Sequence, residues 1–171
     1  MVGPTAEGDG RVSFLVDGNN VMGQRVGWHR DRPGARRRLL GDLALFARLE
    51  AASLTVVFDG APDEHVPDGS DFMGVRVFYA ERGSNADERI KSMVDAARER
   101  RTLLVVTSDR RLADYVRRSG VRVERSGEFR KRLDAARRRD DAPAHGDEPA
   151  PSHDELLREM RYFGVGPEDD E

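Results

Sequence analysis

Four aspartates occur in sequence contexts that could assemble a site for phosphate chemistry: Asp17 in FLVDGNN, Asp59 in VVFDG, Asp87 in SNADERI and Asp109 in VVTSDR. A single aspartate after a strand is usually a turn residue or a helix cap. Four carboxylates brought to one place repel one another and raise each other's pKa unless a cation neutralises them. The chain has no cysteine and its four histidines are scattered. The residue types therefore favour an oxygen-only site for Mg²⁺ or Mn²⁺, which suits hydrolysis of a phosphodiester.

Small polar residues accompany these aspartates. Gly18 follows the first of them and would allow a tight turn or the close approach of a ligand. The amides and hydroxyls beside the motifs can donate to phosphate oxygens or orient a carboxylate. Supporting polar groups are expected at Asn19, Asn20, Thr107 and Ser108.

Basic and aromatic residues near the same motifs could contact RNA. Arginine side chains bind phosphates, but the same arginines also suit a solvated helix face, and both interpretations stay open. Trp28 and His29 could bind a base, although a packed tryptophan and a surface histidine are favoured. The candidate RNA-binding residues are Arg36, Arg37, Arg38 and Arg110.

Short apolar runs alternate with helical patterns along the chain. Runs rich in β-branched and aromatic residues occupy 12–16, 54–58, 75–79 and 102–106, with a weaker one at 121–123. Apolar residues recur at helical spacing in 35–51 and 86–99, around 112–116, and in 127–138. This alternation predicts an α/β, doubly wound sheet of about five mainly parallel strands flanked by helices. The carboxyl ends of parallel strands share one edge, where Asp17, Asp59 and Asp109 would meet, with Asp87 beside them.

The remaining segments set the domain organisation. Residues 1–10 are expected to be a disordered N-terminus, 11–139 the domain, and 140–171 an acidic linker and tail that could form one short helix. Residues 60–74 are rich in Gly, Pro, Asp and Ser and are expected to form a long loop over the active face or a disordered segment. Eleven acids and two arginines lie from residue 140 onward, a net charge of −9, which leaves +6 on residues 1–139. A basic body is compatible with a polyanionic partner.

Composition indicates a cytoplasmic protein. No apolar run is long enough to cross a bilayer, and the first ten residues lack the pattern of a secretion signal. Of 29 basic residues only Lys91 and Lys131 are lysine, which indicates a GC-rich bacterial genome.

Taken together, the motifs VDGNN, VVFDG, NADERI and VVTSDR resemble the NYN domain family of PIN-like ribonucleases, particularly its YacP-like bacterial branch, over residues 12–139. The resemblance implies a central parallel sheet and a metal-dependent endoribonuclease (a hydrolase) that leaves 5′-phosphate and 3′-hydroxyl ends. Carried over position by position, it implies that the catalytic and Mg²⁺- or Mn²⁺-binding carboxylates are Asp17, Asp59, Asp87 and Asp109. The Gly- and Pro-rich loop after FDG departs from the expected ordered crossover.

Two functions from different classes remain. The first is an endoribonuclease acting on RNA, whether ribosome-associated or structured, with no membrane partner and with the oligomeric state left open. The alternative is a non-catalytic RNA-binding module on the same fold. Retention of all four acids argues against that alternative, because RNA binding gains nothing from gathered negative charge.

Overall fold

One six-stranded sheet organises the part of the chain that the computed structural model describes, residues 11–142. The strand order is β3-β4-β2-β1-β5-β6, and all neighbours pair in parallel except β3, which runs antiparallel to β4. The strands are β1 (Ser13–Asp17), β2 (Ser53–Phe58), β3 (Ser70–Phe72), β4 (Val75–Tyr79), β5 (Leu103–Val106) and β6 (Arg122–Glu124). The predicted mainly parallel α/β sheet is confirmed, with one strand more than expected.

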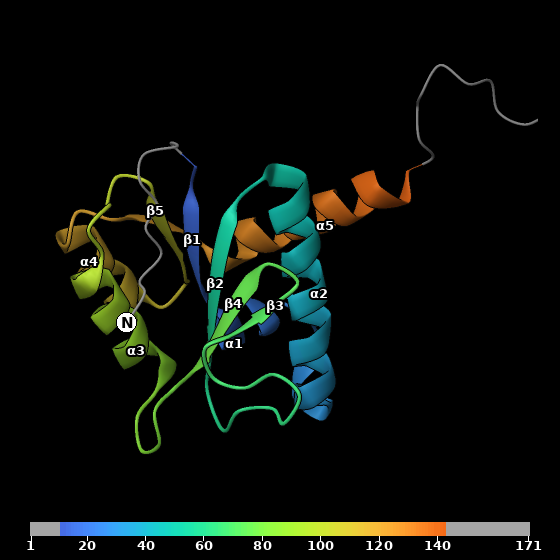
Figure 1. Ribbon diagram of the computed structural model, residues 1–171, viewed down its shortest axis with the longest axis horizontal. Coiled ribbons are helices and arrows are strands. Elements are labelled where there is room, and N and C mark those ends of the chain that lie inside the picture. The colour runs from blue at the N-terminus through green and yellow to red at the C-terminus, as the bar shows by residue number, and fades with distance from the viewer. Residues whose placement is uncertain (1–10, 143–171) are drawn as a thin grey trace, which may run out of the picture. The chain divides into compact units, whose positions relative to one another are not determined.

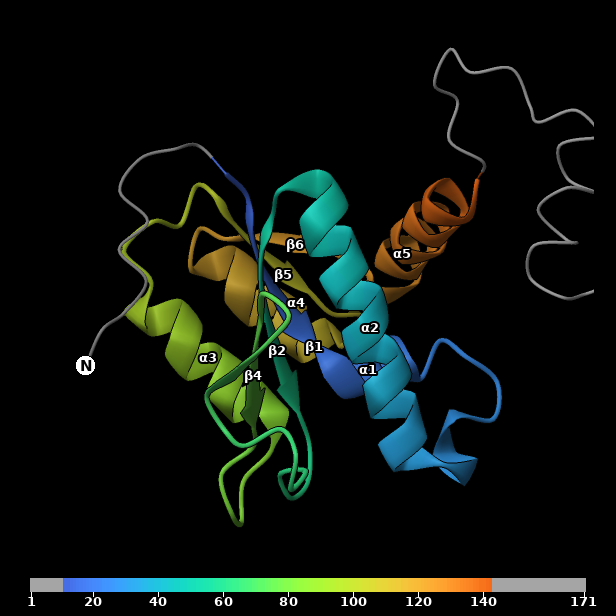
Figure 2. The ribbon, with the colours of Figure 1, turned by 45° about the vertical axis from the view of Figure 1, so that its right-hand side comes forward.

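Helices cover both faces of this sheet (Figure 1). Figure 2 shows α2 and α5 on one face and α3 and α4 on the other, as a doubly wound fold requires. The helices are α1 (Gly18–Met22), the 3₁₀ turn η1 (Trp28–Arg30), α2 (Arg32–Glu50), α3 (Ala86–Ala96), α4 (Arg110–Arg118) and α5 (Ser126–Asp141). Of these, α1 was not expected, because five residues are too few to show a helical period.

The alternation of side chains along the strands divides the core into two layers. Phe14 and Val16 of β1 pack in the layer formed with α2 and α5. Leu15, between them, packs in the layer formed with α3 and α4. Strands that are buried on both faces appear in a sequence as nearly continuous apolar runs, which is why these strands could be predicted from the sequence.

Local capping explains where two of the helices begin. The Asp31 carboxylate accepts the backbone N–H of Gly34 at 3.0 Å, and Pro33 occupies the first turn, so α2 starts three residues before the predicted boundary. Asn85 accepts the N–H of Glu88 at 3.0 Å and caps α3.

The connection from β2 to β4 is more ordered than predicted. It contains β3, a short polar strand whose three residues give no readable alternation. The loop before β3 is attached to the body through Asp68, which accepts the N–H of Tyr79 at 2.9 Å and pairs with Arg89 at 2.9 Å. The Tyr79 hydroxyl also donates to the Val66 carbonyl at 2.8 Å. The expectation of a segment without regular structure is therefore wrong for Ser70–Phe72.

The predicted N-terminus, 1–10, and most of the predicted tail, 143–171, lie outside the described residues. Helix α5 runs to Asp141, two residues past the predicted domain boundary. Within residues 11–142, no helix is long and apolar enough to span a membrane.

Candidate active site

The four candidate aspartates all lie at the carboxyl edge of the parallel strands. Asp17 is the last residue of β1 and Asp59 directly follows β2. Asp109 follows β5 and caps α4, while Asp87 lies in the first turn of α3. The strand order reverses between β1 and β5, and open α/β sheets bind ligands at such a switch point.

Asp17 is a buried carboxylate with a strongly perturbed pKa. Its side chain is 4% exposed, and its Oδ2 accepts the hydroxyl of Thr107 at 3.1 Å. The pKa of Asp17 is raised from 3.8 to about 7, chiefly by burial and to a smaller extent by the negative charges of Asp87 and Asp59. Hydrogen bonds from Thr107 and from the backbone of Asn20 act in the opposite direction on the pKa. Near neutral pH, both the acid and the carboxylate forms of Asp17 are therefore populated.

Asp87 interacts electrostatically with each of the other three aspartates. Its pKa is raised first by burial and then by the charges of Asp109 and Asp59, while Lys91 lowers it. Its charge also acts on the pKa of Asp17. Within residues 11–142 the Asp87 carboxylate makes no hydrogen bond or ion pair. The α3 helix thus holds this carboxylate among the strand-end acids, where the charge of Lys91 partly offsets their repulsion.

Asp59 and Asp109 each satisfy the start of a helix with one oxygen. Oδ1 of Asp59 accepts the N–H of Ala86, the first residue of α3, at 2.8 Å. Oδ1 of Asp109 accepts the N–H of Leu112 in the first turn of α4 at 2.9 Å. Capping and ligand binding can coexist here, because a carboxylate has two oxygens and about four acceptor sites.

The two asparagines of DGNN connect the strand ends to one another. Oδ1 of Asn19 accepts the N–H of Asp59 at 3.0 Å. Oδ1 of Asn20 accepts the N–H of Ser108 at 2.8 Å and the hydroxyl of Ser126. Both amide oxygens are therefore engaged by the protein, and these residues position the loops that carry the aspartates.

A second pair of hydroxyls completes this framework. Oγ1 of Thr107 accepts the N–H of Asp109 at 3.1 Å. Oγ of Ser108 accepts the N–H of Ser126 at 2.9 Å. Ser126 was not among the predicted site residues, and as the first residue of α5 it is recognisable in the sequence only as a helix start.

Gly18 is required by close packing. A Cβ at this position would lie 2.5 Å from Cδ1 of Phe58, closer than any side chain allows. Among the described residues, those with a positive φ do not include Gly18, so the backbone conformation of the turn does not require glycine. The start of α1 therefore rests directly on β2, and the close approach of a ligand to Gly18 stays a prediction.

The four predicted RNA-binding arginines fall into two groups. The Arg36 guanidinium donates to the carbonyl of Asp59 and, at 2.9 Å, to that of Ala61, so it supports the loop after β2. It also lies 5.4 Å from the ring centroid of Phe58. The other three are exposed: Arg37, Arg38 and Arg110.

The donor set has the chemistry of a site for a hard divalent cation. It consists of oxygen ligands whose mutual repulsion a cation would relieve. Among residues 11–142, no three His, Asp or Glu side chains lie close enough, as they stand, to hold a metal ion. Mg²⁺ does not require three, because it usually keeps several waters and binds through one or two carboxylates plus substrate phosphates.

Comparison with known proteins places this arrangement in a family. The fold is similar to a crystal structure of Rae1 (YacP) from Bacillus subtilis, with a TM-score of 0.61 and 21% identity over 90% of this chain and 84% of that chain. A substituted form of the same protein gives a TM-score of 0.62 and 20% identity over 92% and 86% of the two chains. No curated protein matches the sequence. The sequence matches the YacP-like NYN domain over residues 14–160. The chain therefore belongs to the YacP-like NYN domain family.

Proposed function

We propose that this chain is a metal-dependent endoribonuclease that hydrolyses RNA phosphodiester bonds at the edge where Asp17, Asp59, Asp87 and Asp109 gather. Membership of a family with a PIN-like nuclease fold supports a ribonuclease function in general. The observation that carries the specific proposal is the position of Asp87. It lies close enough to the three strand-end carboxylates for their negative charges to interact with its own. A fold that only bound RNA would not concentrate negative charge there.

Mg²⁺ or Mn²⁺ would be held by these four aspartates, and a bound divalent ion supplies positive charge to the phosphate oxygens and lowers the pKa of water. The protein's own contribution is to fix the carboxylates before the ion and the substrate arrive. Asn19 connects the ends of β1 and β2, and Asn20 connects the end of β1 to the segment after β5. Such pre-organisation keeps the ligands from having to reorganise during the reaction.

The substrate backbone would be held by the exposed arginines beside this edge. Arg37 and Arg38 lie in the first half of α2, and Arg110 opens α4 next to Asp109. Hydrolysis adds water across the bond between phosphorus and the 3′ oxygen. The products are a 5′-phosphate and a 3′-hydroxyl, as the family resemblance implies.

The deciding assay is cleavage of mixed RNA with Mg²⁺ or Mn²⁺, compared with the same reaction in EDTA. Asp59→Asn is the best test variant, because the amide oxygen can still accept from Ala86 while the charge is lost. Asp114→Asn is the matched control, since it removes one exposed carboxylate from the middle of α4. We expect the wild type and Asp114→Asn to cut RNA only with metal, and Asp59→Asn to lose at least about 100-fold in rate.

Equal cleavage by Asp59→Asn and the wild type would reject the assignment of the site. RNA that is bound in EDTA and never cut with metal would favour the alternative, a non-catalytic RNA-binding module. End-group analysis of the fragments adds an independent check, because a 2′,3′-cyclic phosphate would contradict the proposed attack by water.

A further inference from the structure

A pocket lies beside the carboxyl end of α1. The pocket, of about 170 Å³, opens between the end of α1, the loop that follows it, and the first half of α2. Its wall combines aromatic, apolar and cationic side chains. The residues that define its chemistry are Met22, Arg25, Trp28, Arg38, Asp42 and Arg130.

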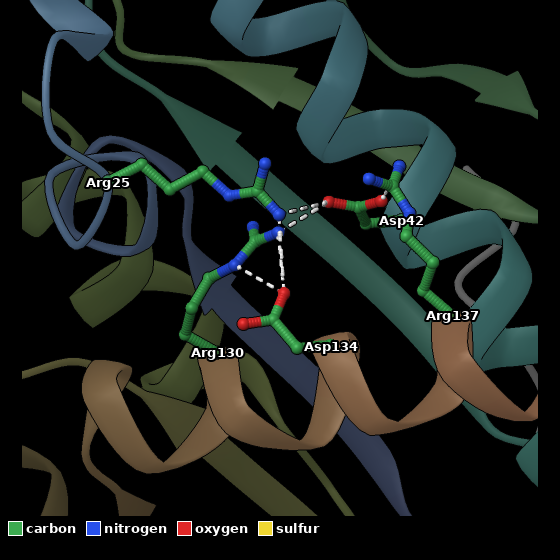
Figure 3. Close-up of polar contacts among 5 residues, drawn as sticks. All are labelled: Arg25, Asp42, Arg130, Asp134 and Arg137. Carbon is green, nitrogen blue, oxygen red and sulfur yellow. Dashed lines mark hydrogen bonds and ion pairs between the residues drawn. The ribbon is translucent and has the colours of Figure 1, made fainter.

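The buried acid of this pocket is already neutralised. Asp42 is 3% exposed, and its two oxygens lie 2.6 Å from guanidinium nitrogens of Arg130 and Arg137, which belong to α5. Arg25 reaches in from the loop after α1 and lies 3.2 Å from Asp134 and 3.8 Å from Asp42 (Figure 3). This cluster therefore carries three arginines against two carboxylates.

Arg38 adds a further positive charge to the pocket. Its side chain is exposed and makes no hydrogen bond or ion pair with residues 11–142. The pocket itself is lined by three arginines, Arg25, Arg38 and Arg130, and by one aspartate, Asp42, so it remains cationic after its internal ion pairs are formed. An anionic ligand with charge-assisted hydrogen-bonding oxygens matches this arrangement.

Trp28 also lines the same pocket. Its ring is partly buried against the core, and the Arg32 guanidinium lies 5.4 Å from the ring centroid. A ring fixed by packing and by a cation is a suitable platform for a nucleobase, since stacking accepts every base. Trp28 is packed against the core, as the sequence favoured, and this packing is compatible with a role in binding a base.

The pocket also lies close to the carboxylate edge. Met22 is the last residue of the five-residue helix α1, which begins directly after Asp17. Five residues of α-helix rise roughly 8 Å. An RNA strand that passes over Asp17 can therefore continue into the pocket.

We propose that this pocket is a nucleotide subsite for single-stranded RNA, in which one base lies against Trp28 and the adjoining phosphate is held by Arg38 and Arg25. The identity of the ligand rests on the proposed ribonuclease function. The pocket requires an unpaired nucleotide, because a base within a duplex cannot leave its stack without a cost. The subsite would position RNA for cleavage without taking part in the chemistry.

Trp28 is the only tryptophan of the chain, so its fluorescence reports directly on the pocket. The experiment titrates the full chain with single-stranded hexaadenylate in EDTA, and follows both Trp28 emission and the anisotropy of a labelled hexaadenylate. We expect binding to quench Trp28. Arg38→Gln should weaken binding about three-fold or more and reduce the slope of log K against log salt by about 0.7.

Arg48→Gln is the matched control, since it changes an exposed arginine on the same helix that lies outside the pocket. It should bind like the wild type. Trp28→Phe keeps an aromatic face and should bind within about three-fold, whereas Trp28→Leu should lose about ten-fold by anisotropy. Thermal melts of each variant separate lost binding from lost folding.

Three results would overturn the subsite. They are binding without a change in Trp28 emission, equal affinities for Arg38→Gln and Arg48→Gln, and equal quenching by a blunt RNA duplex. The titration contains no metal, so it is independent of cleavage. A chain that is quenched by RNA yet never cuts it would keep the subsite and lose the proposed nuclease function.

Discussion

The hydroxyl of Thr107 connects two aspartates of the candidate site. It donates to Oδ2 of Asp17 at 3.1 Å, while its oxygen accepts the backbone N–H of Asp109 at 3.1 Å. The first and last of the four candidate aspartates are thus held through a single side chain. Donation to Asp17 favours the ionised form, so this bond partly offsets the burial and the repulsion that raise the pKa of Asp17.

Asp17→Asn is expected to stabilise the metal-free protein above neutral pH. The pKa of Asp17 is raised from 3.8 to about 7 in the folded chain. Between those values the folded state binds more protons than the unfolded state, so stability falls as pH rises and levels off above about 7. At pH 8 in EDTA, the variant should gain roughly 2–4 kcal/mol in the free energy of unfolding. Urea unfolding from pH 4 to pH 8 measures this.

The gain should be absent at pH 4, where the wild-type carboxyl is protonated in the folded state. Asp114→Asn serves as the control and should change stability by less than about 0.5 kcal/mol at either pH. A variant Asp17→Asn that is less stable than the wild type at pH 8 would contradict the raised pKa.

Thr107→Val is expected to raise the pKa of Asp17 further. The substitution keeps the branched shape but removes the donor to Asp17 and the acceptor for the N–H of Asp109. In EDTA, the pH at which stability levels off should therefore move upward, and overall stability should fall by about 1–3 kcal/mol. Thr107→Ser retains the hydroxyl and should keep the wild-type midpoint. A shared midpoint for the two variants would show that the hydroxyl does not tune Asp17.

Divalent ions are expected to stabilise the folded chain through Asp87. At pH 8, Mn²⁺ at 100 times its dissociation constant should add about 2.7 kcal/mol of stability. Asp87→Asn should lose most of this gain, because Asp87 interacts with all three other carboxylates. Differential scanning calorimetry with and without Mn²⁺ tests it. Glu88→Gln, which changes a neighbouring exposed side chain, should retain the stabilisation by Mn²⁺. If Asp87→Asn and Glu88→Gln lose this stabilisation equally, the ion acts through general charge screening and not through a site at Asp87.

Asn20→Ala is expected to loosen the junction between β1, the segment after β5, and α5. It would leave the Ser108 N–H and the Ser126 hydroxyl without their acceptor, at a cost of about 1–3 kcal/mol. Asn20→Asp keeps an acceptor oxygen but adds a negative charge beside Asp17. At acidic pH, the stability of Asn20→Asp should therefore lie between those of the wild type and Asn20→Ala. It should fall more steeply than theirs as pH rises. Chemical unfolding at pH 5 and pH 8 distinguishes these behaviours.

The neighbouring arginines of α2 are expected to differ sharply. Arg36→Ala removes donors to the carbonyls of Asp59 and Ala61 and the contact with the Phe58 ring, so it should cost about 1–3 kcal/mol of stability. Arg37→Ala changes an exposed side chain and should stay within about 0.5 kcal/mol of the wild type. Melting curves of the two variants, measured side by side, compare them. Equal losses would show that Arg36 does not support the loop.

The arrangement of the strands and the placement of the aspartates could be predicted from local sequence. Runs such as LTVVF are apolar at all positions but Thr55 because both faces of β2 are buried. Once the sheet is parallel, residues that follow the strands must share an edge, which is why Asp59 and Asp109 could be placed together. Both predictions need only short-range pattern and one topological rule.

The polar framework could not be predicted, because it depends on partners far away in the sequence. Nothing near Asn20 indicates that Ser126 will meet it, and Gly18 looks like a turn residue until Phe58 is placed against it. The strand β3 also cannot be predicted from its local sequence, since its three residues take their conformation from pairing with β4. In each case tertiary contacts outweigh local propensity.

The hydrogen bonds of the framework have a consequence for when the candidate site assembles as the protein is made. They join residues separated by 40 positions for Asn19 and Asp59, 90 for Asp17 and Thr107, and 106 for Asn20 and Ser126. Contacts of such long range close only after the intervening chain is available, and they slow folding. A nascent chain that has not yet released Ser126 can already join Asn19 to Asp59 and Asp17 to Thr107, but it lacks the hydroxyl through which Asn20 connects the end of β1 to α5. Synthesis itself therefore delays assembly of the candidate site until nearly the whole domain has emerged.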